Sequence, residues 1–121
     1  ISKITEDHSY VAELIKNGTI KPEEAMHHPQ KNLITRALGT SKDLKVDVKN
    51  ITINDRDFIL ICTDGLSNML SDEEILDTVI SVKDYKTICH ELVNKANLNG
   101  GFDNVTVVVI DVQLGGVDND R

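Results

Sequence analysis

The stretch Phe58-Ile59-Leu60-Ile61-Cys62-Thr63-Asp64-Gly65 is one of the two most apolar parts of the sequence, and a carboxylate stands near its end. Its apolar run predicts a strand buried on both faces, and Gly65 would let the chain turn sharply after it. The second apolar part, residues 100–109, reverses this order, because a Gly-Gly pair and Asp103 precede the run. A carboxylate at a buried strand end is costly unless it is paired or binds a cation. If neighbouring strands bring Asp64 and Asp103 together, the two predict a site for magnesium or manganese.

The composition is typical of a single soluble globular domain. The chain has 121 residues, of which 40% are hydrophobic and 27% charged, so it can bury a sizeable core. Aromatic residues make up only 3% and Trp is absent, so the core must consist of Ile, Leu and Val. The net charge of −7 argues against nucleic acid or an anionic membrane as a partner.

The cysteines and the start of the chain bear on its location and extent. Cys62 lies in the apolar strand and Cys89 on the apolar stripe of a predicted helix, so both are expected to be reduced core residues. A disulfide between them stays open, since the two elements could pack together. The sequence contains no secretory signal and no apolar run long enough to span a bilayer, which predicts a cytoplasmic location. The chain begins at Ile1, within a predicted strand, which suggests a piece of a longer protein.

Local signals predict an α+β domain. Ser9 is a good N-cap, Pro22 suits a first helical position, and Ser71 opens a capping box. The expected elements are a strand at 1–5, helices at 9–17 and from Pro22 to before Pro29, strands at 33–38, 46–53 and 58–63, helices from 71 to about 80 and from about 84, and a strand at 104–112. A loop is expected after Gly65. Long connections favour α+β over a repeating βαβ array, and residues 113–121 are expected to be a solvated tail.

Four stretches, in register along most of the chain, carry a resemblance to a known family. They are Thr5-Glu6-Asp7-His8-Ser9, His28-Pro29-Gln30-Lys31-Asn32-Leu33-Ile34-Thr35-Arg36-Ala37-Leu38-Gly39, Cys62-Thr63-Asp64-Gly65-Leu66-Ser67 and Gly101-Phe102-Asp103-Asn104-Val105-Thr106. The chain resembles the bacterial branch of the metal-dependent PPM (PP2C-type) protein serine/threonine phosphatases. The similarity is to the C-terminal half of their catalytic domain and covers nearly all of residues 3–112, so residues 1–112 are expected to be that half.

This resemblance implies a central β-sandwich of two antiparallel sheets flanked by helix pairs. In the family, two metal ions bridge a water that attacks the phosphorus of a phosphoserine or phosphothreonine protein. Asp64 and Asp103 would be carboxylate ligands of one ion, Mn²⁺ or Mg²⁺, with two or more ions in the complete domain. Asn104 and Gly65 would support the site from beside the ligands. Residues from about 11 to 28 would correspond to the flap beside the active site that influences substrate choice.

The family's N-terminal half has no counterpart in this sequence. That half carries the Arg that grips phosphate, the Asp-Gly-x-Gly-Gly motif with the ligand that bridges both metals, and the His proposed as general acid. We therefore expect this chain alone to bind metal weakly and to have little or no phosphatase activity. Its expected partners are phosphoproteins and either the missing N-terminal half or a second copy. The alternative is a non-catalytic, phosphatase-like module that binds or regulates a partner through uncovered sheet edges.

Ordinary structural roles compete with the functional ones. Asp64 and Asp103 could be plain turn residues, because Asp is favoured in turns. Arg36 could bind phosphate or pair with a local carboxylate. The four histidines lack the spacing of a metal site, so surface or capping roles are expected, and no serine has the His-Asp arrangement of a serine-nucleophile hydrolase. A helix-turn-helix DNA binder at 71–97 fails on the acidic charge.

Overall fold

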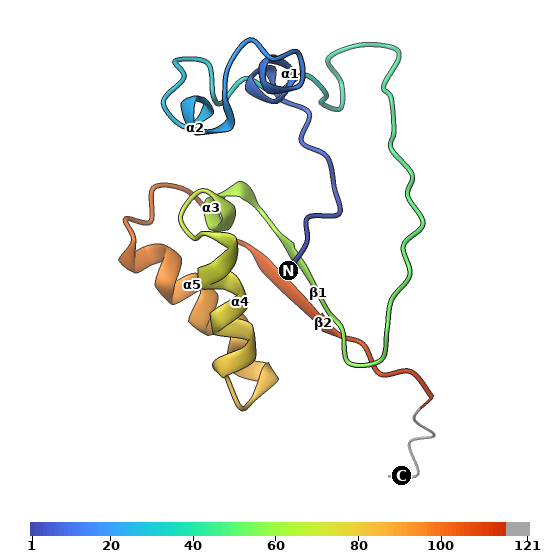
Figure 1. The fold of residues 1–121 in the computed structure, drawn as a ribbon, viewed down its shortest axis with the longest axis vertical. Helices are drawn as coiled ribbons and strands as arrows, with labels where there is room; N and C mark the ends of the chain where they lie inside the picture. The colour runs from blue at the N-terminus through green and yellow to red at the C-terminus, as the bar shows by residue number, and fades with distance from the viewer. Residues whose placement is uncertain (116–121) are drawn as a thin grey trace. The chain divides into compact units, whose positions relative to one another are not determined.

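The chain folds as two compact units. A computed structural model describes residues 1–115 (Figure 1), in which Ser2–Asn50 form one unit, and Ile1 with the residues from Ile51 onward forms the other. Of the expected tail at 113–121, residues 116–121 lie outside the described part, while residues 113–115 are exposed and belong to no helix or strand. None of the helices in residues 1–115 is long and apolar enough to cross a membrane.

The unit of residues 2–50 contains the two short helices that the sequence predicts. Helix α1 (Tyr10–Lys16) begins after Ser9, whose hydroxyl accepts a hydrogen bond from the backbone N–H of Ala12 at 3.2 Å. It ends at Gly18, which has a φ of 74° and therefore occupies the left-handed region that glycine adopts without strain. Helix α2 (Pro22–Ala25) has proline at its first position, as predicted. Local capping signals thus placed the start of both helices, but α2 ends at Ala25 and not just before Pro29.

In the second unit, helices pack against a two-stranded antiparallel sheet. The strands are β1 (Phe58–Cys62) and β2 (Val107–Asp111), paired so that Leu60 lies opposite Val109. The helical elements are α3 (Asp64–Ser67), α4 (Asp72–Ser81), the 3₁₀ turn η1 (Tyr85–Thr87) and α5 (Ile88–Leu98). Figure 1 shows α4 and α5 side by side along the sheet. The predicted α+β class with antiparallel strands is confirmed.

The core lies between these helices and one face of the sheet. The buried apolar side chains that form the core cluster come from the helices and the loop between α3 and α4; they are Leu66, Leu70, Ile75, Ile88, Leu92 and Ala96. Leu60, Val107 and Val109 pack against this cluster from the sheet. The opposite face of the sheet is apolar but open, because Ile61, Val108 and Ile110 are 57%, 48% and 43% exposed. The expectation that the first strand is buried on both faces is therefore wrong at Ile61, since helices cover only one side of the sheet.

Three predicted strands are not formed within residues 1–115. The segments at 1–5, 33–38 and 46–53 belong to no sheet, and the pair Ser9 and Ile34 makes only an isolated bridge. Alternating side chains indicate which way a segment would face, but a strand also needs a neighbour that exchanges backbone hydrogen bonds with it. The second sheet of the expected sandwich is accordingly not present among the described residues.

Two further expectations need correction. The loop expected after Gly65 does not begin there, because Leu66 and Ser67 still belong to the one-turn helix α3. Cys62, the last residue of β1, is exposed, and Cys89 is half-buried, so the expected core position is wrong for Cys62. Both cysteines are free thiols, which agrees with the reduced state that we expected and not with a disulfide.

Candidate metal centre

The two predicted carboxylates lie at the same end of the sheet. Hydrogen bonds of Thr63 connect the segment that follows β1 to the segment that precedes β2. The last ladder pair is Cys62 opposite Val107. The backbone N–H of Thr63 donates to the carbonyl of Thr106 at 3.0 Å, and the Thr63 hydroxyl accepts from the Thr106 N–H at 3.0 Å. We call this set of hydrogen bonds the Thr63 joint. Asp64 follows Thr63 directly, so the joint fixes the position of the Asp64 backbone.

The same hydroxyl also reaches the residue that follows Asp103. Thr63 Oγ1 donates to the carbonyl oxygen of Asn104 at 3.3 Å. One threonine side chain therefore accepts from Thr106 and donates to Asn104, which uses both functions of a hydroxyl. The segment that carries Asp103 is thereby held against the segment that carries Asp64.

Gly65 lies where two pieces of backbone come close together. A Cβ on this residue would stand 2.0 Å from the carbonyl oxygen of Asn104 and 3.3 Å from Cγ2 of Val105. Gly65 lies inside α3 and its φ is not positive, so the expected sharp turn is wrong. The chain needs glycine here for its lack of a side chain, which allows α3 to approach the Asn104 backbone.

Asp103 also shows the ordinary turn role that competes with metal binding. Its Oδ1 accepts from the backbone N–H of Asn104 at 2.7 Å. The preceding glycines make the turn out of α5, with φ values of 131° at Gly100 and 56° at Gly101. One bond to Oδ1 orients the carboxylate and leaves lone pairs on both oxygens, so the turn role and a ligand role are compatible.

The donor set suits a hard cation but is small. Asp64 and Asp103 are both exposed, and residues 1–115 contain no group of three or more His, Cys, Asp or Glu side chains that could hold a metal ion. Magnesium and manganese favour carboxylate and water oxygens, with about six ligands. Two carboxylates fit the chemistry of such an ion, but the other ligands must come from water or from outside these residues.

Cys62 ends β1 two residues before Asp64. Partial burial of its sulfur raises the pKa of the thiol, and the negative charge of Asp64 raises it further, although the residue as a whole is exposed. The two carboxylates by themselves form an oxygen-only pair. This chemistry favours magnesium or manganese over softer ions.

Other candidate residues have structural roles. Arg36 pairs with Asp47 at 2.9 Å, which confirms the local carboxylate partner among the two roles considered for it. His28 Nδ1 accepts from the backbone N–H of Gln30 at 3.0 Å, in agreement with a capping role. Thr63 was missed, because a threonine at the end of a strand is common and nothing in its spacing marks it as a joint.

The sequence profile of the family described as Protein phosphatase 2C matches residues 34–105, which is more than half of the chain. The chain belongs to the protein phosphatase 2C family. Among its relatives, the serine/threonine phosphatase stp of Listeria welshimeri is 39% identical over 114 residues, which cover 94% of this chain and 45% of that protein. The protein phosphatase PhpP of Streptococcus pneumoniae is 41% identical over 110 residues, or 91% of this chain and 45% of PhpP.

Solved structures of the family share this fold. The serine/threonine phosphatase of Streptococcus agalactiae aligns with a TM-score of 0.88 at 37% identity, over 91% of this chain and 46% of that one. The catalytic domain of the phosphatase PstP, solved in complex with two manganese ions, aligns with a TM-score of 0.74 at 38% identity, over 93% of this chain and 45% of that one. The chain thus spans about half the length of the curated relatives that it matches.

Proposed function

We propose that this chain is the C-terminal half of the catalytic domain of a metal-dependent protein serine/threonine phosphatase, and that Asp64 and Asp103 ligate one of its divalent ions. The observation that carries the proposal is the Thr63 joint, which holds the segments bearing these carboxylates together at one end of the sheet. Support also comes from the family membership and from the manganese ions in the PstP structure. The ion would be Mn²⁺ or Mg²⁺.

In this proposal the chain's own residues position oxygen ligands for hydrolysis of phosphoserine or phosphothreonine proteins. Divalent ions held there would supply an activated water and positive charge to neutralise the phosphoryl oxygens. Asp64 and Asp103 would each contribute a carboxylate, with Asp103 oriented by the N–H of Asn104. Gly65 would let α3 stay close to that segment, and Asn104 and Gly65 would thus support the ligands without touching the ion.

We further propose that the remaining ligands come from the N-terminal half of such a domain or from a second copy of the chain. The chain alone would then bind metal weakly and turn over little or no substrate. The open face of the sheet, with exposed Ile61, Val108 and Ile110, favours an additional layer that covers it. Two free cysteines fit a cytoplasmic location for the assembled protein.

The same open face is the support for the other candidate function, a non-catalytic module that binds a partner through its sheet. That candidate gives no reason for two carboxylates to be held at one end of the sheet by the bonds of a single threonine. The catalytic proposal explains both features, so we favour it.

The test is manganese-dependent hydrolysis of a phosphothreonine peptide by two proteins. One is the chain as it stands, and the other is the chain joined to the part of the Streptococcus agalactiae phosphatase that the alignment does not cover. We expect turnover from the joined protein only, and its loss in Asp64→Ala and Asp103→Ala. Asp43→Ala, which removes an exposed carboxylate outside the candidate site, is the matched control. A joined protein that folds but shows no metal-dependent turnover would contradict the proposal.

A further inference from the structure

In the unit of residues 2–50, the segment that contains α1 and α2 leaves and rejoins the chain at one narrow point. The backbone N–H of Tyr10 donates to the carbonyl of Leu33 at 2.9 Å, and the N–H of Thr35 donates to the carbonyl of His8 at 3.0 Å. Between these two bonds lies the isolated bridge of Ser9 with Ile34. We call these paired residues, 8–10 and 33–35, the neck of the segment.

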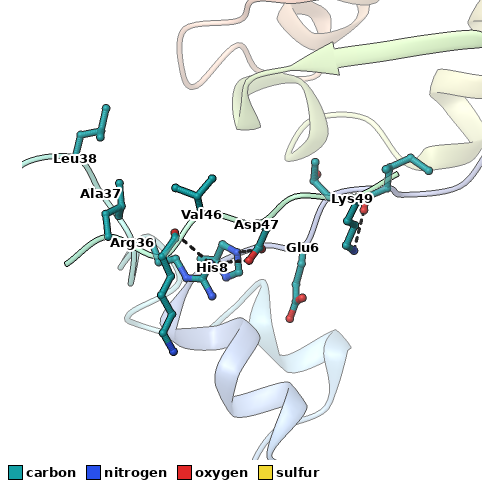
Figure 2. A pocket seen from close by; sticks show the side chains of 12 residues that line it. Glu6, His8, Arg36, Ala37, Leu38, Val46, Asp47 and Lys49 are labelled. Carbon is teal, nitrogen blue, oxygen red and sulfur yellow. Dashed lines mark hydrogen bonds and ion pairs between the residues drawn. The ribbon is translucent and has the colours of Figure 1, made fainter. Parts of the chain in front are cut away.

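A single carboxylate binds both chains at the outer end of the neck. Asp47 Oδ2 accepts from His8 Nε2 at 2.5 Å, and Asp47 Oδ1 accepts from Arg36 at 2.9 Å. Figure 2 shows the side chains of His8 and Arg36 converging on Asp47. An ionised carboxylate only accepts hydrogen bonds, so the ring nitrogen Nε2 of His8 must carry the hydrogen in this bond. Each oxygen of Asp47 therefore binds a different one of the two chains that form the neck.

The electrostatics favour an ionised Asp47 in this position. The hydrogen bond from Arg36 lowers the pKa of Asp47 most, and the bond from His8 lowers it further. The side chains of His8 and Arg36 are only 25% and 29% exposed, and that of Asp47 is 43% exposed. Three charged or polar groups in a partly sheltered network hold one another better than an isolated surface ion pair does.

Side chains, not a backbone ladder, connect the segment around Asp47 to the neck. Arg36 also donates to the carbonyl of Lys45 at 3.4 Å, and Lys49 Nζ donates to the carbonyl of Ile4 at 3.1 Å. Within residues 1–115, no backbone–backbone hydrogen bond ties residues 44–49 to the neck. A half-open pocket of about 530 Å³ lies among these side chains. Among residues 1–115, Asp47 is the residue whose side chain bonds to His8 on one chain and to Arg36 on the other.

We infer that Asp47 is a clamp that keeps the neck closed, so that the segment of residues 9–35 moves as one body and only within narrow limits. The clamp would act on the hinge of the segment, because it binds His8 and Arg36 at the outer end of the neck and does not bind α1 or α2. One consequence rests on the proposed function: if residues 11–28 are the flap that the family resemblance implies, Asp47 is a positioning residue that limits the movement of that segment.

Amide hydrogen exchange, followed by NMR on the chain as it stands, tests this inference. In Asp47→Asn the amides of Tyr10 and Thr35 should exchange roughly fivefold faster, as expected when two partly exposed ion pairs are lost. The amide of Asn17, which bonds to Glu13 at the end of α1, should keep its rate, because a clamp at the hinge leaves the helix intact. Asp43→Asn, in the same stretch of chain but with no ion pair among residues 1–115, should leave all three rates unchanged.

The outcome separates a clamp from a general structural role. Unchanged rates at Tyr10 and Thr35, or an equal increase at Asn17, would overturn the inference. Arg36→Lys keeps the charge but loses the fork geometry of the guanidinium, so a smaller, selective increase at the neck is expected, and its absence would also count against the clamp. None of these measurements needs turnover, so failure of the proposed function would leave them intact.

Discussion

Gly65→Ala tests the close approach that shapes the candidate metal centre. The added Cβ would stand 2.0 Å from the Asn104 carbonyl oxygen and 2.9 Å from its carbonyl carbon, whereas ordinary contacts begin at 3.4 Å. Both atoms belong to the backbone, so no side chain can rotate away. Either α3 or the segment around Asn104 must move by well over an ångström, which would weaken the bond between Thr63 and Asn104.

Overpacking of a tight site costs about 1–3 kcal/mol, and the rigid neighbour places Gly65→Ala at the upper end, about 2–3 kcal/mol. Gly65 is buried beside Leu66, which is fully buried, so α3 cannot shift without disturbing the core. For a domain of this size the loss should lower the melting temperature by roughly 5–10 °C. Urea unfolding followed by circular dichroism gives the free energy of unfolding. Ser67→Ala, at an exposed position of the same helix, is the control and should change it little.

A Gly65→Ala protein as stable as the Ser67→Ala control would refute the reasoning. It would mean that α3 and the Asn104 segment do not approach as closely as described. The glycine would then be explained by its turn propensity, which is the interpretation that the sequence suggested first. If the variant is destabilised but binds manganese as tightly as the wild type, the candidate site does not depend on the close approach of α3 to the Asn104 segment.

Three other changes have expected results. Thr63→Ala should lower the free energy of unfolding by about 1–2 kcal/mol, because the N–H of Thr106 and the carbonyl of Asn104 lose their hydroxyl partner. Thr63→Ser keeps the hydroxyl and should retain most of the stability. Urea unfolding measures both variants. Leu92→Ala should cost about 2–5 kcal/mol in the same assay, since this core side chain is fully buried, and a cost below about 1 kcal/mol would contradict the core assignment. The Ser71 backbone N–H holds the pKa of Glu74 below its usual value of 4.5. The capping box therefore stabilises the fold fully above that pH and loses this contribution as the pH falls through the lower, folded-state value. Glu74→Gln removes the titrating carboxylate, so thermal unfolding across acidic pH should show this variant to be less sensitive in this window than the wild type.

The parts of the fold that follow from local chemistry could be predicted from the sequence. The caps at Ser9 and Ser71 place α1 and α4 within a residue or two, because a cap hydrogen bond needs only neighbours in the chain. The segment at 46–53 shows the limit. Its alternation is real, but a strand depends on a partner that lies elsewhere in the chain or outside it.

The candidate site divides in the same way. The residue types at Asp64 and Asp103, with apolar runs beside them, predicted two carboxylates at one sheet end, and the antiparallel pairing of β1 with β2 agrees. Thr63 and the reason for Gly65 could not be predicted, since both depend on a tertiary approach between segments some forty residues apart. An Asp-Gly pair favours a turn in most sequences, and only the packing of α3 overrides that preference here.

Manganese binding tests the central claim, that Asp64 and Asp103 hold the same ion, most directly. Electron paramagnetic resonance of Mn²⁺, titrated with the chain joined to the uncovered part of the Streptococcus agalactiae phosphatase, would give the affinity for wild type, Asp64→Asn, Asp103→Asn and the double variant. If the two carboxylates share an ion, each substitution should weaken one class of site at least about tenfold, and the double variant should lose less than the product of the two effects. A single variant that binds manganese as tightly as the wild type, or two losses that multiply independently, would contradict the account.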